Sequence, residues 1–532
     1  MDRHFGVRRA MQNVEVKALA RPIRRLHIRP LPKKLYDRRL FLLDNPCFLR
    51  KPVMELQSPQ AAPDLRRRAF MGALAGAALS AAGGAEATCP ADPLSVCNVT
   101  HLYSVPTAGI VVVKDAADVR EALQRWPGRM SIGGGRYSMG GQTGLVGGQQ
   151  LDMRTMQQLV RLDPVRKIAR VQAGMRWRAL QEILDPFDLS VRTMQSYANF
   201  SIGGSVSVNC HGRYVGHGAV VSSIRALQLV LADGEVLEAS PERNTELFHA
   251  AIGGYGAVGA ITEVELSLDD NFAIERSTTR VPLEDYPAWF RRNVAGDPAA
   301  LMHNADLSPP GFSNPRCVTW RRSDKAVTEP SRLRPVGSAY LKEKAAIWAM
   351  TELPGGRALR RQLLDPLLDK PAVVWRNHEA SLDVAELEPA TRSIATYVLQ
   401  EYFIPERHFV AFARKMATLL QSGATGTLNV SIRHAQADHH TLMAWAREDV
   451  FSFVVYYKQR IAPTAQQAVA DWTRAMIALA VAHDGCYYLP YQLHATRQQF
   501  EDAYPRVTAL RALRKSTGAM RFSNALWERY AV

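Results

Sequence analysis

The spacing of apolar residues changes repeatedly between residues 100 and 270, and this change predicts an α+β region. Asp115–Trp126 and Trp177–Leu184 repeat apolar residues at the spacing of an amphipathic helix. Ile224–Leu231 and Glu235–Ala239 predict a hairpin across Asp233-Gly234. Short β-branched or alternating runs predict further strands at Gly109–Val113, Gln149–Met153, Ile168–Ala173 and Ala260–Leu268.

After residue 270 the pattern is sparser. Helical spacing returns at Leu341–Met350 and Ala465–Ala482. A chain of 532 residues is too long for one ordinary core, so we expect a second domain in this part.

Two stretches poor in side chains lie in the α+β region. Ser131–Gln142 reads SIGGGRYSMGGQ, and Ser201–Gly212 reads SIGGSVSVNCHG. Consecutive glycines let backbone amides approach a pyrophosphate and donate to it. Arg136 would add charge to such a site and Ser138 a hydroxyl group. One glycine cluster alone is more often a mobile turn, but two of them predict a nucleotide site.

A third glycine group, Gly254, Gly256 and Gly259, spells G-x-G-x-x-G. A dinucleotide fingerprint needs a helix after the glycines. The segment that follows, Ala260–Leu268, alternates like a strand, so we reject a Rossmann fold.

The net charge of +16 lies mainly at the front of the chain. Residues 1–70 hold 17 Lys/Arg and 6 Asp/Glu, which gives +11 of that total. The excess in the remaining chain is too small to indicate a nucleic-acid partner.

Residues 54–88 have the order of an export signal. Leu65-Arg66-Arg67-Arg68-Ala69-Phe70-Met71 precedes an Ala-rich run that ends at Ala85-Glu86-Ala87. The adjacent arginines resemble a twin-arginine signal, and the apolar run is too short to span a membrane. We therefore expect export to the periplasm. Residues 1–53 are a basic extension or a leader upstream of a true start at Met54.

Cysteines are few. Cys89 and Cys97 are close enough in sequence to pair in an oxidising compartment. No C-x-x-C spacing supports zinc or attached haem, so we expect no metal. His434, His439 and His440 have a loop-like context that favours ordinary surface histidines.

Four segments in order resemble the flavin domain of the vanillyl-alcohol oxidase and p-cresol methylhydroxylase superfamily: IGGGRYSMGGQ, SIGGSVSVNCHG, LVLADGEVLEAS and ELFHAAIGGYGAVGAITEVEL. The resemblance implies a two-part FAD-binding domain of the p-cresol methylhydroxylase type over residues 100–270. It also implies an α+β substrate domain with an antiparallel sheet over 271–484, and a segment over 485–532 that returns to the FAD domain.

The same resemblance implies which residues contact FAD. The first loop would hold the pyrophosphate through Gly133, Gly134, Gly135, Arg136, Tyr137, Ser138 and Gln142. The second would flank the ribityl chain and flavin ring through Ser201, Ile202, Gly203, Gly204, Asn209, His211 and Gly212. Ile261 would lie near the adenine or the ring.

Two departures from the family concern covalent attachment. Tyr137 stands where many relatives have a flavin-linked His, and Asn199 stands where some have a flavin-linked Cys. We therefore expect FAD to be bound non-covalently.

The chain resembles the sugar, alditol and lactone oxidase branch most closely. Gln400–Pro405 and Leu428–Arg433 resemble substrate-domain strands of that branch. Arg433 matches the arginine of its Glu-x-Arg strand, whereas Ser431 replaces the glutamate and Tyr491 replaces an active-site lysine.

An alcohol substrate would need its hydroxyl held and its proton accepted, with oxygen or another acceptor taking the electrons. Arg433 would orient the hydroxyl or stabilise charge, Glu401 or His494 would accept the proton, and Tyr491 would hydrogen-bond the oxygen. Each of the four also has a purely structural interpretation. Two further alternatives stay open: the oxidase half of a sugar epimerase system, and a flavin-binding protein without turnover.

Overall fold

The computed structural model describes residues 92–353, 369–389, 391–422 and 425–530. These residues belong to one unit of the chain, Leu65–Val532. The predicted export signal, the leader and Cys89 lie outside the described residues.

A small parallel sheet carries the first glycine loop. Its strands are β3 (Gly109–Val112), β5 (Gln149–Asp152) and β4 (Met130–Gly133), in the order β3-β5-β4. The predicted strand at Gly109–Val113 and helix at Asp115–Trp126 are confirmed, the helix as α2 (Ala116–Arg125). Asp115 begins α2 because its side chain accepts a hydrogen bond from the Asp118 amide at 2.9 Å. A separate two-stranded ladder joins β1 (Ser95–Cys97) and β2 (Ser104–Pro106).

A larger antiparallel sheet follows in the chain, in the order β10-β9-β11-β7-β6, with β8 paired to β11. The predicted hairpin is confirmed, since β9 and β10 pair antiparallel and Gly234 turns between them at φ 91°. The predicted strand after the G-x-G-x-x-G motif is also confirmed as β11, which supports the rejection of a Rossmann fold. The strands are β6 (Leu159–Asp163), β7 (Ile168–Gln172), β8 (Leu189–Val191), β9 (Ile224–Val230), β10 (Val236–Ala239) and β11 (Ala260–Asp270).

Three helices accompany this sheet: α3 (Trp177–Leu184), α4 (Ile202–Ser207) and α5 (Thr245–Ala251). α3 has the predicted bounds and buries Trp177, Leu180 and Leu184 on one face. The second glycine stretch is not entirely a loop, because part of it forms α4. Ile202 and Val206 of α4 are buried in the core, and this packing offsets the low helix propensity of its two glycines.

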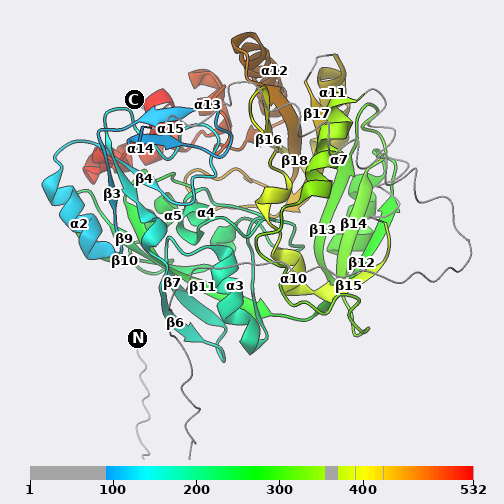
Figure 1. Ribbon diagram of the computed structural model, residues 1–532, viewed down its shortest axis with the longest axis horizontal. Coiled ribbons are helices and arrows are strands. Elements are labelled where there is room, and N and C mark those ends of the chain that lie inside the picture. The colour runs from blue at the N-terminus through cyan, green and yellow to red at the C-terminus, as the bar shows by residue number, and fades with distance from the viewer. Residues whose placement is uncertain (1–91, 354–368, 390, 423–424, 531–532) are drawn as a thin grey trace, which may run out of the picture. The chain divides into compact units, whose positions relative to one another are not determined.

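An eight-stranded antiparallel sheet forms the other half of the described chain, in the order β15-β12-β14-β13-β17-β18-β16-β19. Its strands are β12 (Ala273–Arg280), β13 (Ala300–Leu307), β14 (Arg316–Arg322), β15 (Ala372–Trp375), β16 (Ala395–Pro405), β17 (Thr427–Ala435), β18 (Val450–Arg460) and β19 (Cys486–Tyr487). The helices of this region are α6 (Tyr286–Phe290), α7 (Leu341–Glu352), α10 (Arg376–Ala380), α11 (Phe409–Ser422) and α12 (Pro463–Val481). Helices α11 and α12 contact each other and strand β16 of this sheet (Figure 1).

The last helices are α13 (Arg497–Ala503), α14 (Val507–Ser516) and α15 (Ala525–Tyr530). In Figure 1, α14 and α15, in red, lie beside the blue strands β3 and β4. Phe522 forms a bridge with Met130 of β4, and the buried Arg514 donates to the Ala257 carbonyl oxygen at 3.2 Å. The chain thus closes against the region that carries the glycine motifs.

One continuous core joins the six- and eight-stranded sheets. It contains Leu227 and Val264 of the first sheet and Phe403 and Phe453 of the second. The described residues therefore show mixed helices and largely antiparallel sheets, and the predicted α+β class is confirmed.

Within the described ranges, no helix is both long and apolar enough to cross a membrane, and no group of three or more His, Cys, Asp or Glu is placed to hold a metal ion. Cys97 is disulfide-bonded, whereas Cys210, Cys317 and Cys486 are free and buried. His434 is not in a loop as the sequence suggested, because it lies on β17 and contacts Glu406 at 2.8 Å.

Candidate active site

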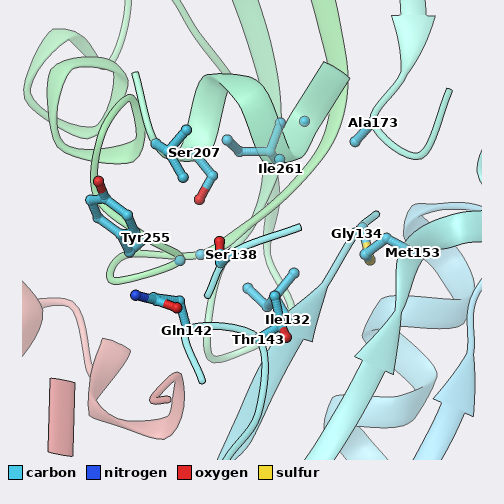
Figure 2. Close-up of a pocket in the computed structure, with 15 residues that line it drawn as sticks. Ile132, Gly134, Ser138, Gln142, Thr143, Met153, Ala173, Ser207, Tyr255 and Ile261 are labelled. Atoms are coloured by element: carbon cyan, nitrogen blue, oxygen red, sulfur yellow. The ribbon is translucent and has the colours of Figure 1, made fainter. Parts of the chain in front are cut away.

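The glycine segments line one cavity (Figure 2). Gly134, Ser138 and Gln142 come from the first loop, and Gly203 and Gly204 come from α4. The third glycine segment and the start of β11 contribute as well. In Figure 2, Tyr255 and Gln142 lie towards the left of the cavity, and Met153 and Ala173 lie towards the right.

The two glycine loops touch directly, although about seventy residues separate them. The Gly135 amide donates to Ser201 Oγ at 3.1 Å. A Cβ placed at Gly134 would lie 2.4 Å from that same Oγ, and a Cβ at Gly203 would lie 2.5 Å from the Ala173 Cβ. Glycine is therefore required by close approach at both positions, and the cavity wall between them is backbone.

Arg136, which follows the three glycines of the first loop, is held by polar partners within the protein. Its guanidinium donates to the Gln150 side chain and lies 3.4 Å from Asp152 Oδ2. Burial lowers the pKa of Arg136, with the Arg154 charge acting in the same direction and Asp152 opposing it. The positive charge that the sequence assigned to a pyrophosphate is thus partly balanced by a carboxylate of the protein.

Gln142 connects the first loop to the C-terminal segment. Its Nε2 donates to the carbonyl oxygens of Leu489 at 2.6 Å and Tyr491 at 2.7 Å. Its Oε1 accepts from the Gly140 amide at 2.8 Å, and the Met139 amide donates to the Pro490 carbonyl at 2.7 Å. The side-chain amide of Gln142 is fully used by these backbone groups, so Gln142 shapes the cavity rather than offering free polar atoms to it.

A second cavity adjoins the first. Both are lined by five common residues: Gly134, Ser138, Thr143, Gly204 and Val208. The second cavity adds aromatic and apolar side chains, among them Tyr137 and Phe200, whose ring centroids are 4.7 Å apart. It also adds Tyr488 and Tyr491 of the C-terminal segment and Leu399 of β16.

Tyr491 brings a buried carboxylate into contact with this second cavity. Its hydroxyl donates to Glu401 Oε2 at 3.2 Å, and His211 Nε2 lies 2.6 Å from Glu401 Oε1. Burial alone raises the pKa of Glu401, but His211, Arg433 and Tyr491 together bring that pKa below its ordinary value. Burial and the Glu401 charge raise the pKa of Tyr491 well above 10.0. The contacts favour an ionised Glu401 beside a protonated Tyr491.

Arg433 acts on this pair through its charge. It lies on β17, on the other side of β18 from Glu401 and offset by two residues: Arg433 faces Ser452, and Glu401 of β16 faces Val454. Its charge lowers the pKa of both Glu401 and Tyr491. Its buried Nε makes no hydrogen bond within the described part of the chain.

The structure does not bring His494 to this group. His494 lies in a different cavity, with Arg474 and Arg529, and its Nε2 contacts the side chain of its neighbour Gln492. Burial and these two arginines lower its pKa to about 4. The expectation that His494 accepts the substrate proton therefore gains no support from its position, because His494 and Tyr491 line different cavities.

Asn209 and Gly212 also lie outside the linings of both cavities. Asn209 Nδ2 donates to the buried Asp438 at 2.8 Å, and its Oδ1 accepts from the Val221 amide. A Cβ at Gly212 would lie 2.1 Å from the Met194 carbonyl oxygen. Both residues hold the second loop in place, and neither offers a group to the cavities.

The comparison with known proteins fits this geometry. Residues 107–240 match the family described as "FAD binding domain". This part of the chain is therefore similar to FAD-binding domains. FAD is the cofactor of this flavoprotein domain, and the match contains both glycine stretches that meet at the first cavity.

Three relatives are informative for this flavoprotein. Cytokinin dehydrogenase 9 of Oryza sativa subsp. japonica is 31% identical over 25% of the chain and 26% of the relative. L-gulonolactone oxidase of Bos taurus is 26% identical over 34% and 39%, and alditol oxidase of a Streptomyces species is 27% identical over 33% and 40%. The matches thus span less than half of each of these relatives' own length.

The residues present fit FAD. Gly134 and Gly203 line the first cavity without side chains, so backbone can approach a cofactor there, and the adjoining second cavity has aromatic side chains in its wall. The two cavities together would hold FAD, with Gly134 and Ser138 at both. Bound flavin supplies a two-electron acceptor for a hydride.

Sequence reasoning missed several wall residues of the flavoprotein site. Tyr255, Thr143, Ser207 and Met153 line the first cavity, and Tyr488 lines the second. Tyr255 and Gly256 had a signal, because they lie within the G-x-G-x-x-G segment. That segment leads into strand β11 instead of a helix, so it does not form a Rossmann turn. Its residues Tyr255, Gly256 and Gly259 nevertheless line the cavity.

Proposed function

We propose that this flavoprotein oxidises a CH–OH group of a sugar, alditol or lactone-like substrate, with FAD bound non-covalently. The observation that carries the proposal is the contact of Tyr491 and the buried Glu401 at the cavity that adjoins the FAD-binding wall. The names of the gulonolactone and alditol relatives support this substrate class.

Three side chains take part in the proposed reaction: Tyr491, Glu401 and Arg433. The Tyr491 hydroxyl lines the cavity and hydrogen-bonds the oxygen of the substrate. Glu401, held ionised by its neighbours, is the proton acceptor of the site. Arg433 places positive charge near both and favours negative charge on a bound oxygen or on a reduced cofactor.

Non-covalent binding is supported by the residues at the two attachment positions. Tyr137 packs its ring on Phe200, and the Asn199 side chain donates to Asp383 at 3.0 Å. Precipitation with acid should release yellow FAD into the supernatant. Colour that stays with the precipitated protein would contradict this part of the proposal.

The function is tested by an anaerobic screen of the purified holoprotein. Polyols, aldono-lactones and cytokinins are offered in turn, and loss of the oxidised flavin absorbance is recorded. Bleaching by a polyol or lactone supports the proposal, and bleaching by cytokinins alone redirects it to the substrate named by the other relative. A cofactor that no compound reduces indicates a flavin-binding protein without turnover.

A substrate that is reduced again at the same carbon when a reductase is added would indicate the oxidase half of an epimerase system. The reoxidation rate in air then decides between oxygen and another electron acceptor.

We also propose export to the periplasm. The disulfide at Cys97 supports it, because disulfides persist in oxidising compartments. Fractionation of cells that express the full chain, with and without Arg66→Lys and Arg67→Lys, tests the proposal.

A further inference from the structure

The inference concerns His211, which comes from the second glycine stretch but lines neither of the two cavities. Its Nε2 lies 2.6 Å from Glu401 Oε1, and both side chains are 3% exposed. Tyr491 contacts the other carboxylate oxygen, Oε2, at 3.2 Å. Three distant parts of the chain thus form one line of polar contacts, from a buried ring to a cavity wall.

Aromatic rings enclose the inner end of this line. The His211 ring centroid lies 4.9 Å from that of Trp445, 5.4 Å from Phe403 and 6.0 Å from Tyr488. The His211 Nδ1 atom has no hydrogen-bond partner among the described residues. Its one polar contact through Nε2 is therefore with Glu401, and rotation of the ring is restricted by its neighbours.

An arrangement that served stability alone would be an expensive one. Burying a carboxylate is unfavourable because the charge loses its hydration, and an apolar side chain of similar volume often replaces a buried ion pair without loss. Glu401 instead keeps one oxygen on His211 and turns the other towards the hydroxyl at the cavity.

We propose that His211 is a positioning residue that keeps Glu401 ionised and aims its Oε2 at Tyr491, so that Tyr491 and Glu401 together remove the substrate proton. This inference rests on the proposed function. The substrate O–H bond breaks and its proton goes to Tyr491 Oη. The Tyr491 proton goes to Glu401 Oε2, and the carbon hydrogen leaves with its electron pair for the oxidised flavin.

Other ionisable groups also face Glu401. Arg433 faces it from β17, Cys486 from β19, Tyr255 from the third glycine segment and Tyr488 from the C-terminal segment. Arg433 is the one cation among these four. Removal of His211 leaves Arg433 in place, so the pKa of Glu401 should rise without losing all of its stabilisation.

The test uses the FAD-loaded full chain and the variants His211→Gln and Glu401→Gln. Gln at position 211 keeps an N–H donor but cannot carry charge. The rate of flavin reduction should rise with pH through the pKa of Glu401. We expect this rise at higher pH in H211Q than in the parent, and no such rise in E401Q. H434Q is the matched control, because His434 of β17 contacts a different carboxylate, Glu406, and its rise should coincide with the parent's.

A second readout needs no substrate. At a pH where the parent shows an ionised Glu401, H211Q should show the infrared stretch of a protonated carboxyl group, and H211Q/E401Q should lack that stretch. A purely structural His211 would lower the thermal midpoint and produce neither change.

The outcomes separate the two proposals. A parent that no alcohol reduces overturns the proposed function and the proton route with it, whatever the infrared spectra show. A parent that is reduced normally, with unshifted pH dependence and no carboxyl stretch in H211Q, overturns the role of His211 alone.

Discussion

Single residues at this site are constrained in two different ways. Gly134 is fixed by shape, because the Oγ of Ser201 occupies the space that a Cβ would need. Tyr491 is fixed by chemistry, because its hydroxyl is the group that connects a buried carboxylate to a cavity. A substitution at the first position should change cofactor binding, and one at the second should change turnover.

Gly134→Ala should weaken FAD binding and lower the thermal midpoint, since forcing a methyl group against a packed neighbour costs about 1–3 kcal/mol. Titration of the apoprotein with FAD, followed by fluorescence, measures the effect. Gly134→Ala/Ser201→Gly removes the opposing Oγ and should recover part of the loss. Gly109→Ala is the control, because its Cβ would make only ordinary contacts. An unchanged affinity in G134A would show that the loops do not need to meet this closely.

Tyr491→Phe should slow flavin reduction by about 10²-fold or more, the usual range for removal of a proton-transfer group. FAD affinity should stay within a few fold of the parent because the ring remains. Rapid-mixing absorbance measures the reduction rate. Tyr103→Phe, in the cavity that holds His494, should match the parent. A Y491F protein that is reduced at the parent rate would remove Tyr491 from the reaction.

At the scale of elements, sequence patterns succeeded where the signal is local. α3 could be predicted with its bounds because Trp177, Leu180 and Leu184 share one face, and the β9–β10 hairpin followed from Asp233-Gly234. β12 gave no such signal: its sequence AIERSTTR has few apolar residues, and the strand forms because β14 and β15 pair with it on either side.

The candidate site was predictable to the same limited extent. The glycines of both loops predicted a cofactor-binding site, because a backbone can approach another group this closely only where the residue is glycine. The positions of His211 and His494 relative to Glu401 could not be predicted from the sequence, because they depend on the path of β16 and of the segment after β19. Those paths are set by pairings between residues far apart in the chain.

Gln142→Leu tests the connection between the first loop and the C-terminal segment. The substitution leaves the Leu489 and Tyr491 carbonyl oxygens without a donor, and an unsatisfied buried group costs about 1–3 kcal/mol. We expect weaker FAD binding and faster proteolytic cleavage near residue 490, measured by mass spectrometry of timed digests. Gln157→Leu is the control, because its exposed amide caps only a local carbonyl. Cleavage at the parent rate in Q142L would mean that other contacts hold the segment.

For the whole molecule, the half-buried His494 makes stability depend on pH. His494 has a pKa of about 4 in the folded protein against an ordinary value of 6.5. Because the folded state binds the proton less readily than the unfolded state, acid favours unfolding. Stability from this group is therefore full above about pH 6.5 and declines towards pH 4.

His494→Gln should flatten that part of the dependence while leaving flavin reduction unchanged, since His494 lies away from Tyr491. Thermal midpoints of parent and variant across this pH range measure the first effect, and anaerobic reduction measures the second. An equal slope in both proteins would show that other groups dominate acid unfolding. A large loss of turnover would return His494 to the list of functional residues.

The hydrogen bonds from Gln142 to the carbonyl oxygens of Leu489 and Tyr491 also bear on how the protein is made. A ribosome releases the first loop some 350 residues before it releases the segment that closes over it. A nascent chain that lacks residues beyond about 485 has an open binding wall, so the yellow colour should be acquired only once synthesis has passed that point.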